Sequence, residues 1–160
     1  MYPLKTETVI TLDECKKLSE SILHKSKPIK KNILLHILIV VAFIVFGQYL
    51  AAIMFSLWAL IVYYFVKRNM QKQTKKNYQS NKNIQNQKVQ YEFYEEFFQT
   101  KTLNSESKMS YSNLYDIIET KEHFYLMESN AVAYIIIKNN CSIELTNHIQ
   151  ELIKKRRNGK

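Results

Sequence analysis

Hydrophobic positions along the chain are concentrated in one long run. From Ile33 to Val66, thirty of 34 residues are apolar or aromatic, and none is Asp, Glu, Lys or Arg. A run of more than about 18 such residues is typical of a membrane-spanning segment. A globular core of this size could not cover that many apolar side chains on every face. We therefore interpret the run as membrane-embedded rather than as a buried core helix.

The length of the run predicts two crossings. A single helix of this length would extend about 51 Å, whereas the hydrocarbon core of a bilayer is about 30 Å thick. Gly47 and Gln48 form the only adjacent non-apolar pair and divide the run into arms at 33–46 and 50–66. A single tilted or re-entrant segment is the alternative.

Basic residues on both sides of the run decide the expected topology. Flanks rich in Lys and Arg stay on the cytoplasmic side of a membrane. A two-helix hairpin keeps both flanks there, so we expect a multi-pass membrane protein with both termini cytoplasmic. The flanking cations are Lys25, Lys27, Lys30, Lys31, Lys67, Arg68, Lys72, Lys75 and Lys76.

Two further patterns lie inside the run. Small residues four apart, Gly47 with Ala51 and Ala52 with Ser56, favour close packing of the two arms and, as an alternative, association of two copies. Aromatic residues are expected at the headgroup level, with one of them deeper. These interfacial aromatics are Tyr49, Trp58, Tyr63 and Tyr64.

Residues 1–32 form a short N-terminal cytoplasmic segment in this interpretation. Thr11 and Glu14 have the spacing of a capping box, which predicts a helix from Leu12 to His24 after a short extended stretch. After the run, residues 67–88 are basic and rich in Asn and Gln. We expect them to form a stalk that extends the second membrane helix and then loosens into a linker.

The pattern changes to strands in the C-terminal domain, residues 89–160. Alternating apolar and polar positions predict about five antiparallel strands, with a turn at Glu95-Glu96 and one bent strand over 108–120. Apolar positions from Ile143 onward recur at helical spacing, and Ser142 or Asn140 can cap that helix. The expected fold class is α+β: a membrane hairpin followed by a bent sheet that one amphipathic helix covers.

The net charge of +9 first suggests a nucleic-acid binder, but its location argues against one. Residues 91–153 hold four Lys against ten Asp and Glu, so this part carries −6. The cations lie at the membrane flanks and in the tail that begins at Lys154. This distribution does not support a polyanion-binding sheet. The flanking cations indicate topology and can also attract anionic lipid headgroups, and the tail indicates either helix capping or contact with such headgroups.

Residue types that carry catalysis are scattered. The four His and two Cys lie on different predicted elements, and two Gly are too few for a phosphate-binding loop. We therefore expect no enzyme activity, catalytic residue, metal site or cofactor. Cys15 and Cys141 are expected to stay reduced in the cytosol.

Short aromatic motifs occur in the C-terminal part of the chain. They are Tyr91-Glu92-Phe93-Tyr94-Glu95, Tyr111-Ser112-Asn113-Leu114-Tyr115, Phe124-Tyr125-Leu126, and Ala133-Tyr134-Ile135 running to Lys138. These motifs resemble those of the YcxB-like family of bacterial membrane proteins. The resemblance implies a bacterial cell membrane and a pleckstrin-homology-like (PH-like) domain, and it transfers no catalytic residue. The chain departs from the family at Glu96, where a Gly is usual, and at Ile137, where a Pro is usual. The motif positions are Tyr91, Phe93, Tyr94, Tyr111, Tyr115, Tyr125, Tyr134 and Lys138.

These observations favour a non-catalytic, membrane-anchored module that binds or senses an unidentified protein or peptide partner. Tyr111, Tyr115, Tyr125 and Tyr134 are candidates to line its binding surface, although packing in the core with the hydroxyl at the rim is the favoured interpretation of any single one. The alternative function is a membrane protein that gives a producer cell immunity to its own bacteriocin. Size, charge and the membrane run permit this role without requiring it.

Overall fold

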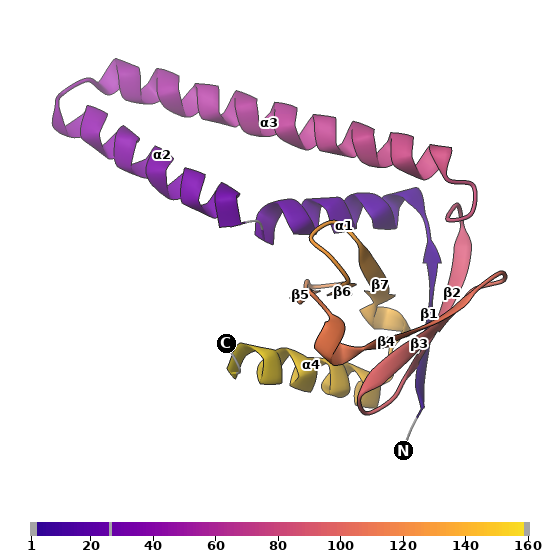
Figure 1. Ribbon diagram of the computed structural model, residues 1–160. Coiled ribbons are helices and arrows are strands. Elements are labelled where there is room, and N and C mark those ends of the chain that lie inside the picture. The colour runs from indigo at the N-terminus through magenta and orange to yellow at the C-terminus, as the bar shows by residue number, and fades with distance from the viewer. Residues whose placement is uncertain (1–2, 26, 159–160) are drawn as a thin grey trace.

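The computed structural model describes residues 3–25 and 27–158, apart from the side chains of residues 27–30. Within these residues, seven strands form two antiparallel sheets, and four α-helices accompany them (Figure 1). The elements in chain order are β1 Leu4–Ile10, α1 Leu12–Lys25, α2 Lys27–Val45, α3 Tyr49–Ser80, β2 Gln87–Phe93, β3 Phe97–Lys101, β4 Glu106–Ser110, β5 Asp116–Glu119, β6 His123–Met127, β7 Ala133–Ile137 and α4 Ile143–Asn158. Two 3₁₀ turns, η1 (Tyr111–Asn113) and η2 (Lys138–Asn140), connect strands and helix. The α+β class is confirmed.

The strands form two sheets rather than the single bent sheet expected from the sequence. One sheet has the order β1-β2-β3-β4, and the other has the order β5-β6-β7. The segment expected to be one bent strand, 108–120, is divided by η1, because the side chains of Tyr111 and Leu114 turn into the core there. The chain thus passes from the first sheet to the second, which makes six strands after α3 instead of about five.

Strand β1 pairs with β2 over its whole length. The antiparallel register runs from Leu4 opposite Phe93 to Ile10 opposite Gln87. The N-terminal strand is therefore part of the same sheet as the C-terminal strands, and α1, α2 and α3 are inserted between two neighbouring strands. We call the two sheets with α1 and α4 the body.

The core of the body lies between the two sheets and α4. Apolar side chains from all three are completely buried, and burial of each is worth about 1.5–3 kcal/mol relative to exposure. They include Phe93, Phe98, Phe124, Leu126, Ile136, Leu145 and Ile149. The helical spacing that predicted the C-terminal helix thus marks its core-facing side. The N–H of Leu145 donates to Ser142 Oγ at 3.2 Å, so Ser142 is the cap.

Helices α2 and α3 run antiparallel and meet at the break that the sequence predicts (Figure 1). Gly47 has φ +72°, its N–H donates to Ile44 O, and the N–H of Gln48 donates to Phe43 O. These two bonds form a Schellman motif, which ends α2 with a glycine in the left-handed region. Helix α3 is long and apolar enough to cross a membrane, whereas the apolar part of α2, Lys31–Val45, is shorter.

The predicted stalk is a helix packed on the body. Helix α3 continues to Ser80, and its second half lies along α1 (Figure 1). Ser19 Oγ and Thr74 Oγ1 are 2.7 Å apart, and Tyr78 Oη donates to Ile10 O at 3.2 Å. Only residues 81–86 form a linker before β2.

Thr11 caps α1 as predicted, but Glu14 does not complete a capping box. The N–H of Glu14 donates to Thr11 Oγ1 at 3.2 Å. The Glu14 carboxylate turns toward the body instead, where it meets Lys17 and His123.

Candidate functional site

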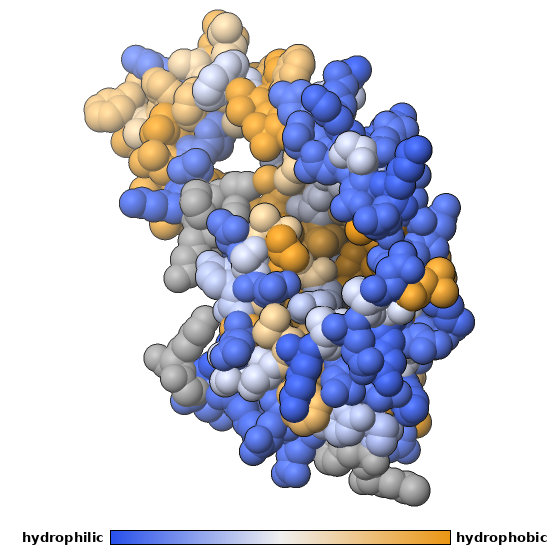
Figure 2. Space-filling model, turned by 45° about the vertical axis from the view of Figure 1, so that its right-hand side comes forward, coloured by the Kyte–Doolittle hydropathy of each residue, from blue (hydrophilic) through white to orange (hydrophobic). Residues whose placement is uncertain are grey.

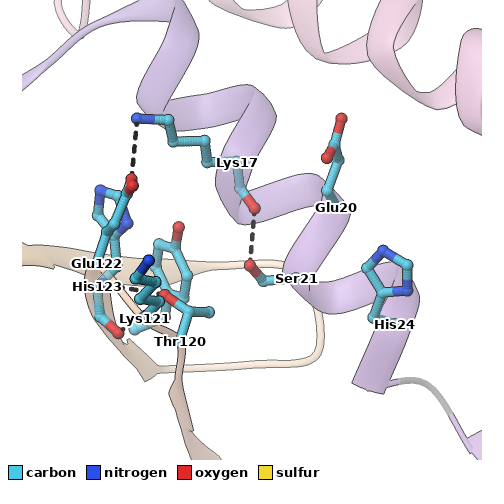
Figure 3. Close-up of a pocket in the computed structure, with 9 residues that line it drawn as sticks. Lys17, Glu20, Ser21, His24, Thr120, Lys121, Glu122 and His123 are labelled. Carbon is cyan, nitrogen blue, oxygen red and sulfur yellow. Dashed lines mark hydrogen bonds and ion pairs between the residues drawn. The ribbon is translucent and has the colours of Figure 1, made fainter.

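A pocket of about 250 Å³ lies between α1 and the turn that joins β5 to β6. Figure 3 shows side chains from both elements around it, with those of α1 on one side and those of the turn on the other. The lining residues are Lys17, Glu20, Ser21, His24, Thr120, Lys121, Glu122, His123 and Tyr125. Cations, carboxylates and hydroxyls thus surround one small space.

A close contact between two buried polar side chains, Glu14 and His123, stands beside this pocket and joins α1 to β6. His123 Nε2 lies 2.5 Å from Glu14 Oε2, and the two residues are 3% and 9% exposed. The His123 ring stacks on that of Tyr125, with the centroids 5.4 Å apart and an angle of 7° between the planes. Buried polar side chains are stable in such a place only when they have a polar partner. The pair therefore fixes α1 on the second sheet.

Lys17 crosses the mouth of the pocket and meets carboxylates on both sides. Its Nζ lies 3.1 Å from Asp13, 3.3 Å from Glu14 and 3.6 Å from Glu122. Hydrogen bonds to Asp13 and Glu14 raise the pKa of Lys17 above its ordinary value. The ammonium group is thus held in its charged form, and it links α1 to the β5–β6 turn.

The floor of the pocket is formed by hydroxyl groups. Burial raises the pKa of Tyr125 to about 12, so this phenol stays neutral at physiological pH. Ser21 Oγ donates to Lys17 O at 2.8 Å. Thr120 fixes the turn, because its hydroxyl accepts from the N–H of His123 at 3.0 Å.

Glu20 connects the pocket to α3. Its carboxylate lines the pocket, accepts from Gln71 Nε2 at 2.6 Å and lies 3.2 Å from Lys67 Nζ. Lys67 is the first residue after the apolar run. Glu20 therefore links the wall of the pocket to the helix that leaves the run.

The described residues contain no group of three or more His, Cys, Asp or Glu side chains placed to hold a metal ion. Cys15 and Cys141 are separate, half-buried thiols, and burial raises the pKa of both.

The motif positions are divided between core and surface. Tyr91, Phe93, Tyr111 and Tyr125 are buried, and Tyr134 is half-buried. Tyr115 is 62% exposed. Most of the tyrosines considered as a binding surface thus pack inside the body, and Tyr115 faces outward.

Tyr94 and Lys138 hold turns in place. The Tyr94 ring stacks on Phe97 at 4.6 Å across the Glu95-Glu96 turn. Among the described non-glycine residues only Asn86 has a positive φ, so Glu96 adopts this turn without the conformation that favours Gly. Lys138 Nζ lies 2.8 Å from Glu119 and 4.4 Å from the centre of the Phe124 ring.

The flanking cations fall into different environments. Lys25 pairs with Asp116 at 2.9 Å, and Lys67 pairs with Glu20. Lys31 is exposed, and the side chains of Lys27 and Lys30 lie outside the described residues. The remaining cations share an exposed side of α3, away from α1, and they are Arg68, Lys72, Lys75 and Lys76.

The four expected interfacial aromatics of α3 are all substantially exposed. Tyr49 begins the helix, and Tyr63 and Tyr64 lie near the other end of its apolar part. Trp58 lies between them and stacks on Phe55, which in turn stacks on His36 of α2 at 4.6 Å. Ala52 is 5% exposed, and Ser56 Oγ donates to its carbonyl.

Residues 93–147 match the model of the family described as YcxB-like protein. The chain carries a YcxB-like domain. The match covers about a third of the chain, from the end of β2 into α4. The YcxB-like part therefore includes β3 and β4 of the first sheet and the whole second sheet, but neither β1 nor the helical hairpin. No curated protein and no solved structure was found to match.

Sequence reasoning missed the pocket and the Glu14–His123 pair beside it. These two residues are 109 positions apart, and no local period connects them. One signal was present: His123 begins a strand, His-Phe-Tyr-Leu-Met, in which all five residues are buried. An ionisable residue in such a strand needs a buried partner.

Proposed function

We propose that this protein is a non-catalytic, membrane-anchored module that binds a protein or peptide partner at the cytoplasmic face of a bacterial membrane. In this proposal the body is PH-like, because a four-stranded and a three-stranded antiparallel sheet with a C-terminal helix is the arrangement of that domain class. The hairpin of α2 and α3 is its anchor.

The pairing of β1 with β2 is the observation that carries the proposal. These strands lie on opposite sides of the apolar run in sequence and are hydrogen-bonded neighbours in one sheet. Residues before and after the run are therefore on the same side of any membrane that it enters. A single crossing is incompatible with this pairing, which favours the two-crossing hairpin.

The surface of the hairpin supports a membrane environment. Figure 2 shows apolar surface gathered over the hairpin and largely hydrophilic surface over the body. Val45 is 75% exposed, Phe46 78% and Leu50 73%. Exposed apolar area on this scale exceeds what a monomer leaves in water, and hydrocarbon would cover it. The cations before and after the run then favour the cytoplasm for the body.

Cysteine labelling tests the topology. In a variant with Cys15→Ser and Cys141→Ser, we expect Gln48→Cys in the α2–α3 turn to react with a membrane-impermeant maleimide in intact cells. The matched variant Asn158→Cys, at the end of α4, should react only after permeabilisation. Labelling of Asn158→Cys in intact cells would contradict the proposed topology.

The pocket is the binding place that we assign to the partner. It is walled by α1, so an occupant there contacts α1 directly and is joined to α3 only through Glu20. A photo-crosslinking amino acid at Lys121, which lines the pocket, should give a discrete adduct in cells. Asn104, exposed in the β3–β4 turn, is the control position. No adduct at 121, or the same adduct at both positions, would exclude the pocket.

A further inference from the structure

Three elements meet at one end of the body. Lys25, in the last turn of α1, donates to Ile117 O at 2.8 Å and pairs with Asp116, so it holds the first residues of β5. Arg156, in the last turn of α4, donates to Leu114 O just before β5. Two cations thus bind the ends of two helices to the same edge of the second sheet. We call this part of the molecule the α1–β5–α4 end.

This end of the body is the one beside the anchor. Helix α2 begins at Lys27, two residues after Lys25, and rises about 9 Å before it reaches Ile33 and the apolar run. Figure 1 shows the C-terminal end of α4 directed to the same side of the molecule as the tip of the hairpin. If the hairpin is embedded, the α1–β5–α4 end is close to the membrane surface.

The side chains at this end suit a membrane surface. Tyr115 follows the Leu114 carbonyl that Arg156 binds and is 62% exposed. Val132, in the neighbouring β6–β7 turn, is 54% exposed. The last turn of α4 adds exposed cations, Lys154, Lys155 and Arg157, to a body that is otherwise acidic. An amphipathic aromatic ring with nearby cations is characteristic of the headgroup region of an anionic bilayer.

The helix dipole gives a simpler account of the cations alone. Positive side chains stabilise the last turn of a helix wherever it lies. That account does not explain why Tyr115 is exposed beside them, or why this end is the one that faces the anchor.

We propose that the α1–β5–α4 end rests on the anionic surface of the bilayer that the hairpin enters, with Tyr115 at the contact and Lys154, Lys155 and Arg157 beside it. The inference depends on the membrane anchoring proposed above. It adds a second attachment, which fixes the orientation of the body and leaves the β3–β4 turn directed away from the membrane.

Tryptophan quenching in reconstituted vesicles tests the contact. Trp58 is the only tryptophan, so Trp58→Phe provides a silent background for Tyr115→Trp. We expect brominated anionic lipids to quench and blue-shift the emission of Trp at 115. Leu103→Trp, at a position 92% exposed in the β3–β4 turn, is the matched control and should remain unquenched.

Charge reversal and salt provide the second measurement. Each cation near an anionic surface favours contact by about fivefold, so Lys154→Glu, Lys155→Glu and Arg157→Glu together should shift the contact equilibrium by at least about 100-fold. Quenching at 115 should fall in this variant, at high salt and in zwitterionic vesicles. The substituted side chains are exposed, so the body should keep its fold.

Quenching of the native Trp58 distinguishes a failure of the second attachment from a failure of the membrane anchoring. If brominated lipid quenches Trp58 in the wild-type protein but quenches 115 no more than 103, the second attachment is refuted and the anchor stands. If Trp58 itself is unquenched, the membrane anchoring fails and the inference fails with it.

Discussion

The buried pair of Glu14 and His123 gives the sharpest prediction about the stability of the body. The substitution His123→Leu removes one partner and leaves the Glu14 carboxylate 9% exposed. Lys17, at 3.3 Å, is the cation that remains beside it. Substitution of both residues, Glu14→Leu with His123→Leu, removes the buried carboxylate together with its partner.

The magnitudes follow from the cost of a buried polar group. Leaving a buried polar group without its partner costs about 1–3 kcal/mol, and we expect His123→Leu to fall in this range because the Lys17 contact remains. Replacing a whole buried pair by apolar side chains is often nearly neutral. We therefore expect the double variant to be more stable than His123→Leu alone.

An exposed pair of similar geometry is the control. Lys88 and Glu7 lie 2.8 Å apart on the outer face of the first sheet, and both side chains are 52% exposed. Such pairs contribute about 0–1 kcal/mol, so Glu7→Gln should change stability little.

Urea unfolding of the full chain in detergent micelles, followed by near-ultraviolet circular dichroism, measures these differences. The reasoning is refuted if His123→Leu costs no more than Glu7→Gln. It is also refuted if the double variant loses the sum of the two single losses, because additive losses mean that the residues do not interact.

Three further predictions concern the core, the pH dependence and the anchor. Phe98→Ala, at a completely buried position, should cost about 3–5 kcal/mol in the same unfolding assay; a loss below 1 kcal/mol would contradict the packing described here. Burial lowers the pKa of His148 below 6.5, so the unfolded chain binds protons more readily and His148 should reduce stability as the pH falls below 6.5. His148→Asn should therefore flatten the urea midpoint between pH 7 and 5, and an unchanged slope would contradict this. Replacing residues 27–66 by a short Gly-Ser linker should give a body that stays in solution without detergent and unfolds cooperatively, because the Glu20–Lys67 pair already brings the two ends together; aggregation or a non-cooperative transition would contradict it.

Elements that depend on local pattern were predictable from the sequence. The break at Gly47 and the start of α4 at Ser142 follow from the conformations that those residues favour. The Thr11 cap and the extent of α1 also follow from the local sequence. Each depends on residues within one or two turns of each other, which is the range that local patterns report.

Features that depend on distant pairs were not predictable in the same way. Strand β1 finds its partner more than 70 residues later, beyond the whole apolar run. The alternation of apolar and polar residues along 108–120 is the same whether the chain continues in one sheet or enters a second. The sequence therefore did not predict that η1 divides this segment into two strands. Glu14 has the spacing of a capping box, but the buried His123 attracts its carboxylate more strongly than the exposed end of α1 does.

The position of the apolar hairpin in the chain, between β1 and β2, determines how firmly the body is held relative to the hairpin. An anchor at a chain end would leave the body free to move on its linker. Here the apolar hairpin replaces the connection between β1 and β2, and both of its arms continue into helices that pack on the body, α1 through Glu14–His123 and α3 through Tyr78. Movement of one arm relative to the other therefore displaces a wall of the pocket. Under the proposed function, pocket occupancy and hairpin geometry bias each other by the same free energy, since coupling between two sites is reciprocal.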